Sequence, residues 1–336
     1  MKKQILSYLS LGQICDVQSG GTPSRHINAY WENGNIPWVK ISDIKGKHLF
    51  GTDEFITRQG LENSSAKIFP KGTILYTIFA TLGETTILNI DAATNQAIAG
   101  INIHDQYKEI ILTDYLYYYL LSIKDIMCKI GRGVAQNNLN LKILRNVQVP
   151  VPSIEEQKKI IDTLSLIEKI MLVKDKQLSR LSNLVKSRFL ERFGEPGVND
   201  KEFPCYPVGQ IAESVTYGTS APASNSGQYE YLRMNNLTDN GQLDLSDLKR
   251  IDMSDEQAEK YMVKKGDILF NRTNSIDLVG KTALFNLNTP MIIAGYLIRI
   301  RLSDKVNPVY FTAYMNMPYM KEKLRNMAKG AVNRKR

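Results

Sequence analysis

The sequence predicts an α/β protein made of two similar α/β domains that are joined by a long spacer helix of the coiled-coil type. Three observations carry this prediction. Short motifs recur in order at a spacing of about 195 residues, strand-type runs precede a helical stripe in each copy, and a heptad pattern separates the copies. A chain of 336 residues, of which 43% are hydrophobic, is long enough for two packed cores.

The repeat consists of matched blocks that keep the same order in both halves of the chain. Residues 11–14 (LGQI) return as 208–211 (VGQI), 21–22 (GT) as 218–219 (GT), 37–44 (PWVKISDI) as 230–237 (EYLRMNNL), 71–76 (KGTILY) as 265–270 (KGDILF), 83–86 (GETT) as 280–283 (GKTA), and 98–100 (IAG) as 293–295 (IAG). Several blocks in one order indicate a duplicated domain.

Each copy begins with short strand-type runs, such as residues 73–79 and 267–271, bounded by turn-forming residues. Each copy is then expected to end in one helix that packs on the sheet. In the first copy the apolar stripe at three- and four-residue steps is Leu116, Tyr119, Leu120, Ile123, Met127 and Ile130. Residues 310–327 occupy the equivalent place in the second copy. The tyrosines at 115 and 117–119 are expected in core and rim packing, with base stacking as the alternative.

The segment between the copies has a helical signature of its own. Residues 149–152 (VPVP) form an extended lead, Ser153 with Glu156 forms a capping box, and 193–197 (FGEPG) ends the helix. The seam that a partner helix would cover is Ile160, Leu164, Ile167, Met171, Leu178, Leu181 and Val185, interrupted by Lys174. Since such a stripe would otherwise face water, the chain is expected to self-associate or to bind a partner helix.

These patterns divide the chain into residues 1–150 as the first domain, 151–193 as the spacer helix and 194–336 as the second domain. A helix of some forty residues would be roughly 60 Å long at 1.5 Å per residue.

The charge balance favours a polyanionic partner. Forty-three Lys and Arg against thirty-four Asp and Glu give a formal net charge of +9, which fits nucleic acid, although a basic soluble protein is the alternative. Cys15, Cys128 and Cys205 are far apart and indicate neither a zinc site nor a disulfide framework. No signal segment or membrane span is recognised, so a cytoplasmic location without membrane contact is expected.

Catalytic motifs are not completed in this sequence. The GKT at 280–282 lacks the earlier glycine of a phosphate-binding loop, because Ser275 stands there. The NPVY at 307–310 resembles a methyltransferase motif, but a turn into a helix is the better interpretation. His26, His48 and His104 have no metal-ligand spacing. We therefore expect no enzymatic activity, no cofactor and no metal.

The chain resembles the specificity subunit of type I DNA restriction-modification systems. The motifs that carry the resemblance are 36–44 (IPWVKISDI), 71–76 (KGTILY), 138–141 (NLNL) and 149–157 (VPVPSIEEQ), the last followed by the heptad helix. The similarity covers essentially the whole chain. Recognition subunits of type IIG or type IIB systems share this plan and are an alternative, as is a coiled-coil interaction subunit that does not read DNA.

The resemblance implies two target-recognition domains, each reading one half of a split site in double-stranded DNA. It also implies modification subunits, which carry the adenine methyltransferase, and restriction subunits, which translocate and cut DNA; the specificity subunit itself is not catalytic. In the family two spacer helices pack as an antiparallel pair, whereas this sequence stops after the second copy. A shortened, phase-variable or split gene product, or a trimmed polypeptide, would each explain the missing helix.

The residues expected to contact DNA lie where strand-type runs end, and they carry side chains suited to phosphate or base-edge contacts. In the first copy they are Lys40, Ser42, Asp43, Thr77, Thr81 and Arg132, with residues 19–25 nearby. In the second copy they are Arg233, Asn235, Asn236, Asn271, Arg272, Thr273 and Asn274. The alternative is that these segments are solvated turns, and that Arg132 only belongs to the end of a helix.

Overall fold

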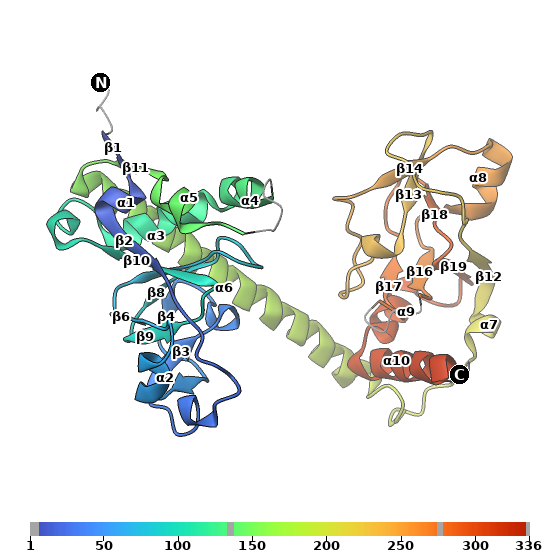
Figure 1. The fold of residues 1–336 in the computed structure, drawn as a ribbon. Helices are drawn as coiled ribbons and strands as arrows, with labels where there is room; N and C mark the ends of the chain where they lie inside the picture. The colour runs from blue at the N-terminus through green and yellow to red at the C-terminus, as the bar shows by residue number, and fades with distance from the viewer. Residues whose placement is uncertain (1–6, 133–137, 274–277, 334–336) are drawn as a thin grey trace. The chain divides into compact units, whose positions relative to one another are not determined.

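The computed structural model describes residues 7–132, 138–273 and 278–333. The chain forms two compact units, Met1–Asp175 (unit 1) and Lys176–Arg336 (unit 2), and the boundary between them lies within the long helix α6 (Ile154–Phe193) (Figure 1). The predicted division at residues 150 and 193 stays a prediction.

Unit 1 contains two main sheets and one short strand pair. The larger sheet has the order β2 (Cys15–Ser19), β10 (Ile98–Ile103), β7 (Ile74–Thr77), β8 (Thr85–Leu88) and β4 (His48–Leu49). The smaller sheet has the order β5 (Phe55–Ile56), β3 (Ile36–Val39), β9 (Ala92–Thr94) and β6 (Ile68–Phe69). Strands β1 (Ser7–Ser10) and β11 (Gln148–Val151) form an antiparallel pair.

Unit 2 repeats this sheet topology. Its first sheet has the order β12 (Ala212–Tyr217), β19 (Leu297–Leu302), β16 (Ile268–Asn271) and β17 (Thr282–Leu284). Its second sheet has the order β14 (Lys249–Ile251), β13 (Tyr229–Leu232), β18 (Met291–Ile293) and β15 (Met262–Val263). In both small sheets the middle pair, β3 with β9 and β13 with β18, is parallel. The predicted fold class is thus confirmed.

The helices are short apart from α6. In unit 1 they are α1 (Leu11–Ile14), α2 (Arg58–Glu62), α3 (Thr113–Ser122), α4 (Lys124–Arg132) and α5 (Leu141–Arg145), with 3-10 turns η1 (Asn28–Tyr30), η2 (Ile41–Asp43) and η3 (Asp105–Tyr107). In unit 2 they are α7 (Val208–Ile211), α8 (Asp255–Tyr261), α9 (Pro308–Met315), α10 (Pro318–Asn333) and the 3-10 turn η4 (Met234–Asn236). Among the described residues, no helix combines the length and apolar character that a membrane crossing needs.

Two matched blocks of the repeat were aligned wrongly from the sequence. The IAG at 98–100 opens β10, whereas the IAG at 293–295 closes β18 and enters a turn. The strand pairing gives the correct match, because Gly100 lies opposite Leu75 and Arg299 lies opposite Leu269, and these two leucines are equivalent. At this position unit 1 has glycine and unit 2 has arginine. A side chain is excluded in unit 1, because a Cβ on Gly100 would lie 2.2 Å from the Phe69 ring.

The GT block is misaligned by one residue for a different reason. Strand β12 has an irregular register between Ala212 and Ser214, so one extra residue is accommodated relative to β2. Gly20 therefore matches Gly218: each donates its backbone N–H to the first residue of the strand that follows the crossing turn, Ile98 or Leu297, at 3.0 Å.

The helix expected after each set of strands is in fact two helices. The chain breaks between α3 and α4 at Ile123, and between α9 and α10 at residues 316–317. In unit 2 Pro318 starts the second helix, because proline cannot continue a helix but fits its first turn. In unit 1 α3 ends where Ser122 donates its hydroxyl to the Tyr119 carbonyl at 2.7 Å.

The predicted spacer helix is present as α6 over Ile154–Phe193. The Ser153 hydroxyl accepts the Glu156 backbone N–H at 3.3 Å, as expected for an N-cap. Gly194 ends the helix with a positive φ of 73°, a conformation that favours glycine after a helix.

Within unit 1, the start of α6 is fixed by one buried amide and one tyrosine. Gln157 is fully buried; its Oε1 accepts the Leu112 N–H at 2.9 Å, and its Nε2 donates to the Ile110 and Pro152 carbonyls at 2.7 and 2.9 Å. The Tyr118 hydroxyl donates to Glu168 of α6 at 2.8 Å. The tyrosines at 115, 117 and 118 are buried, as the sequence indicated.

Within unit 2, the end of α6 is fixed by aromatic packing. The Phe189 ring stacks on Tyr310 of α9 with centroids 5.6 Å apart, and Phe193 meets Tyr310 edge-on at 4.8 Å. The sequence predicted that residues 307–310 lead into a helix, and Asn307 indeed caps α9 by accepting the Val309 N–H at 2.8 Å.

The middle of α6 presents an apolar surface to solvent. Of the predicted seam, Ile160 and Leu164 are both half-buried, and Leu164 packs on the core of unit 1. The other seam residues, Ile167, Met171, Leu178, Leu181 and Val185, are exposed. Other apolar residues of α6 are exposed as well: Leu166, Ile170, Leu172, Val173 and Leu184.

Gln157→Leu is expected to destabilise unit 1 by about 1–3 kcal/mol or more, because it leaves the Leu112 N–H and two carbonyls around this buried side chain without their partner. Lys158→Leu, one residue along on the exposed surface, is the matched control. Chemical denaturation would measure both. Equal stability of the two variants would contradict the assigned role of Gln157.

Candidate nucleic-acid interface

The loops that follow three strands of unit 1 meet at one edge of its sheets. They are hydrogen-bonded to the turn of residues 95–97, where the chain crosses from β9 in the small sheet to β10 in the large sheet, or to Thr94 just before this turn. Gly21 donates its N–H to the Thr94 carbonyl at 2.9 Å, Asn95 to Val39 at 3.0 Å, and Ile78 to Ala97 at 2.8 Å. We call residues 20–25, 40–43, 78–81 and 95–97 the strand-end cluster of unit 1.

Unit 2 repeats these connections. Thr219 donates its N–H to the Ile293 carbonyl at 2.9 Å, Ala294 to Leu232 at 2.9 Å, and Arg272 to Tyr296 at 3.0 Å. Residues 218–220, 233–236, 272–273 and 294–296 form the strand-end cluster of unit 2. The same backbone frame thus carries two different sets of side chains.

Two glycines permit this close approach of backbones. A Cβ on Gly20 would lie 2.0 Å from Thr94 Oγ1, and a Cβ on Gly218 would lie 2.2 Å from the Ala294 carbonyl oxygen. Any other residue would push the loop away from the crossing turn.

The residues after β3 that were predicted to contact DNA differ in their roles. The Lys40 ammonium pairs with Glu54 at 2.5 Å, and the Lys40 backbone N–H donates to Asp43 Oδ2 at 3.0 Å. Asp43 also accepts the Thr52 hydroxyl at 2.8 Å, so its carboxylate holds the 3-10 turn together. Ser42 is exposed in this turn.

The predicted set after β13 follows the same pattern. Arg233 Nη2 pairs with Asp247 at 2.7 Å, and the Arg233 backbone N–H donates to Asn236 Oδ1 at 2.8 Å. Asn236 is buried and donates to the Asp244 carbonyl at 2.8 Å, whereas Asn235 is exposed. Asn236 thus shapes the turn, and its contact with DNA stays a prediction.

The loop after β7 contains one buried and one exposed threonine. Thr77 is fully buried; its hydroxyl donates to the Thr81 carbonyl and accepts the Glu84 N–H at 2.9 Å. Thr81 is exposed. Thr77 thus shapes the loop, and Thr81 is the residue of the pair that a ligand can reach.

Of the described residues 271–273 at the end of β16 and in the loop after it, Arg272 is exposed. Its guanidinium lies over the Tyr217 ring at 4.7 Å, and its Nε donates to the Gly295 carbonyl at 3.3 Å. Asn271 is fully buried and its Oδ1 accepts the Thr273 N–H at 3.0 Å; Thr273 is 8% exposed. Asn274 lies outside the described residues. Arg132 ends α4, and nothing is described of its side chain.

Two acidic residues beside the clusters, Glu54 and Asp247, were missed from the sequence. Arg25 lies across the Trp31 ring at 3.6 Å and pairs with Glu54 at 2.5 Å. Asp247 pairs with Arg233. The available signal was the recurrence of an acidic residue fourteen positions after the equivalent cations Lys40 and Arg233.

The hydrogen bond from Lys40, followed by that from Arg25, holds the pKa of Glu54 below its ordinary value. The Arg233 guanidinium and then Lys249 lower the pKa of Asp247. Both carboxylates therefore stay charged at neutral pH. Within the described ranges, no group of three or more His, Cys, Asp and Glu side chains is placed to hold a metal ion.

Solved structures with this fold exist. The chain matches the type I restriction-modification S subunit of M. genitalium with a TM-score of 0.53 at 12% identity, covering 98% of this chain and 81% of that one. It matches a chain of a type I R-M system, solved in a study of complex assembly and conformational transition, with a TM-score of 0.51 at 17% identity over 95% and 84% of the two chains. These similarities define a class of two-unit α/β chains with a long helix.

The sequence assigns the chain to a family within that class. The profile described as type I restriction modification DNA specificity domain matches residues 7–182. The chain belongs to this family.

Two relatives show how much of a family member the chain spans. It is 28% identical over 284 residues to the type I restriction enzyme MjaIX specificity subunit of Methanocaldococcus jannaschii, which covers 77% of this chain and 64% of the relative. It is 29% identical over 171 residues to the EcoR124I/EcoR124II specificity subunit of Escherichia coli, covering 48% of this chain and 41% of the relative. The chain thus spans less than two thirds of the length of either.

We expect the Glu54 carboxyl to titrate below the ordinary Glu value of about 4.3. Because its folded-state pKa lies below that of the unfolded chain, its stabilising contribution is present above the unfolded value and is lost as the pH falls through the folded one. Lys40→Met should raise this pKa by removing its main cause. Carbon-13 NMR titration of the glutamate carboxyls would show both effects, and a Glu54 midpoint at or above 4.3 in the unmodified chain would contradict the pairing.

Proposed function

We propose that this chain is the sequence-specific DNA-recognition subunit of a type I restriction-modification complex. In this proposal, unit 1 and unit 2 each read one half of a bipartite target in double-stranded DNA. The observation that carries the proposal is the duplicated strand-end cluster, in which one hydrogen-bonded frame presents two different sets of exposed side chains. Two related but non-identical readers suit two different half-sites.

The charges and exposed groups support contact with DNA. The net charge of +9 favours a polyanion. Lys40, Arg233 and Arg272 supply cations at the clusters, while Ser42, Thr81 and Asn235 supply exposed hydrogen-bonding groups. Phosphate contacts position a protein on DNA and base-edge contacts select the sequence, so both kinds of group are needed.

We further propose that the chain performs no chemistry itself and assembles with modification subunits, which carry an adenine methyltransferase, and with restriction subunits. Relatives named as type I restriction enzyme specificity subunits support this assignment. The exposed apolar stripe of α6 supports docking of another helix, because such a surface is unfavourable in water.

Mapping of methylated adenines in a host with and without this gene tests the function. We expect one interrupted motif to lose its methylation when the gene is removed. An unchanged set of methylated motifs would overturn the proposal.

Arg272→Ala should relax one base position in a single half-site and leave the other half-site unchanged, because the two units read separately. A good bidentate contact contributes about 1–3 kcal/mol of discrimination, which is visible in a motif. Lys265→Ala, an exposed cation in the turn before β16, is the control. A uniform loss of binding to all sequences would mean that Arg272 contacts only phosphate.

The apolar stripe of α6 should drive self-association when no partner helix is present. Replacing Leu178 and Leu181 by lysine should shift the chain toward monomer, since both side chains are exposed and apolar. Lysine at Ser179 and Asn183, which are also exposed on α6, adds the same charge and serves as control. Light scattering over a concentration series measures the masses, and a monomeric unmodified chain at high concentration would contradict this prediction.

A further inference from the structure

One carboxylate in each unit holds the cation that follows the parallel strand of the small sheet. Glu54 Oε1 pairs with Lys40 Nζ at 2.5 Å, and Asp247 Oδ2 pairs with Arg233 Nη2 at 2.7 Å. Lys40 and Arg233 occupy equivalent positions, since each is the N-cap of a 3-10 turn, η2 or η4. The pairing is therefore a feature that both units share.

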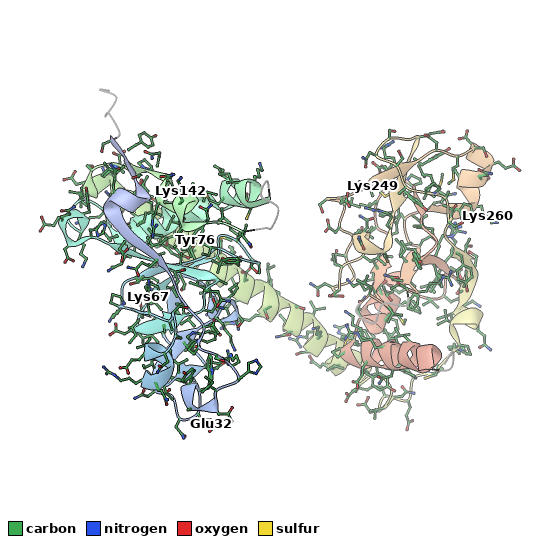
Figure 2. The ribbon with its side chains drawn as sticks, viewed as in Figure 1. Glu32, Lys67, Tyr76, Lys142, Lys249 and Lys260 are labelled. Atoms are coloured by element: carbon green, nitrogen blue, oxygen red, sulfur yellow. The ribbon has the colours of Figure 1, made fainter. Side chains whose placement is uncertain are left out.

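Each of these carboxylates also binds a second cation, and the two units supply it from different elements. Arg25, in the loop after β2, pairs with Glu54 at 2.5 Å. Lys249, on β14, lies 3.5 Å from Asp247; Figure 2 shows Lys249 at the opposite end of unit 2 from α10. Both units thus place a carboxylate between two cations, although the second cation comes from a different element in each unit.

Because both carboxylates are at least partly exposed, their ion pairs contribute little to the stability of the fold. The Glu54 side chain is 27% exposed and the Asp247 side chain 68% exposed. Ion pairs that water can reach contribute little to stability. Their stronger effect is to restrict long, flexible cationic side chains and to cancel part of their charge.

Cancelling charge matters for a protein that must choose among DNA sequences. Free lysines and arginines bind the phosphates of any duplex, and this contribution does not depend on sequence. A carboxylate beside the cations repels phosphate and fixes the direction of their N–H groups. Contacts to base edges, which require correct geometry, are then favoured over contacts to the backbone.

We propose that Glu54 and Asp247 are positioning residues that set the selectivity of the DNA interface, each by holding two cations away from indiscriminate phosphate contact. This inference rests on the proposed DNA-reading function. It assigns Lys40 with Arg25, and Arg233 with Lys249, to one half-site each.

The test compares the full chain with Glu54→Gln and Asp247→Asn in two measurements. The first is affinity for a fixed 30-base-pair duplex of arbitrary sequence over a range of salt concentrations. The second is enrichment of half-sites from a pool of randomised duplexes. Asp105→Asn is the matched control, because Asp105 is an ion-paired carboxylate of unit 1 beyond the far end of β10. Thermal unfolding verifies that each variant is folded.

We expect each variant to bind the arbitrary duplex about three- to tenfold more tightly at moderate salt, with a steeper salt dependence from the released cations. Enrichment should fall about tenfold at one half-site only, a different one for each variant. Glu54→Asp should restore part of the selectivity, and Asp105→Asn should change neither measurement.

Unchanged enrichment, or weaker binding to the arbitrary duplex in a folded variant, would overturn the inference while leaving the DNA-reading function in place. An unmodified chain that neither binds the arbitrary duplex nor enriches any half-site would instead overturn the proposed function, and the inference with it.

Discussion

Each unit depends on one of the turns by which the chain crosses between its two sheets. In unit 1 the crossing is the turn of residues 95–97 between β9 and β10, and in unit 2 it is the turn of residues 294–296 between β18 and β19. The loops after the neighbouring strands donate backbone N–H groups to this turn and to the strand residues beside it, or accept from it. Because buried backbone groups must be paired, these bonds fix where the loops lie.

A fixed frame with variable side chains is suited to recognition. Backbone atoms hold the loops in both units, so exposed residues such as Thr81 and Arg272 can differ between the copies without loss of the frame. The glycines at 20 and 218 keep the frame closed, since a side chain at either position would strike the opposing backbone or side chain. In this account the two half-sites differ because the side chains differ and the frame does not.

Much of the fold was predictable from the sequence because the two copies repeat the same motifs in the same order, so each copy supports the interpretation of the other. The KGTILY and KGDILF blocks align correctly: Gly72 and Gly266 both adopt positive φ, at 91° and 99°, before equivalent strands. The IAG match failed because three common residues recur by chance in different elements. The GT match failed because an irregularity in β12, invisible in composition, shifts the chain by one residue.

The site residues were harder to predict. Asn235 and Asn236 are neighbours of the same type, yet one is exposed and the other is buried as a cap, and only the turn geometry separates them. Thr77 and Thr81 differ in the same way. Glu54 was not predicted, because its partner Lys40 is fourteen residues away in the sequence and is brought near it only by the pairing of β3 with β5. Sequence patterns indicate which loops matter, whereas burial decides which of their side chains a ligand can reach.

If two separate readers are spaced by α6, the length of this helix sets the gap between the half-sites, and a change in that length tests the idea most directly. Four added residues lengthen a helix by roughly 6 Å and turn its far end by about 40°. The experiment uses an assembly with its methyltransferase in which a second helix is supplied and lengthened equally, so that the seam stays in register. At about 3.4 Å per base pair, the gap in the methylated motif should grow by one or two pairs while both half-sites stay the same. An unchanged gap, or altered half-sites, would contradict the account.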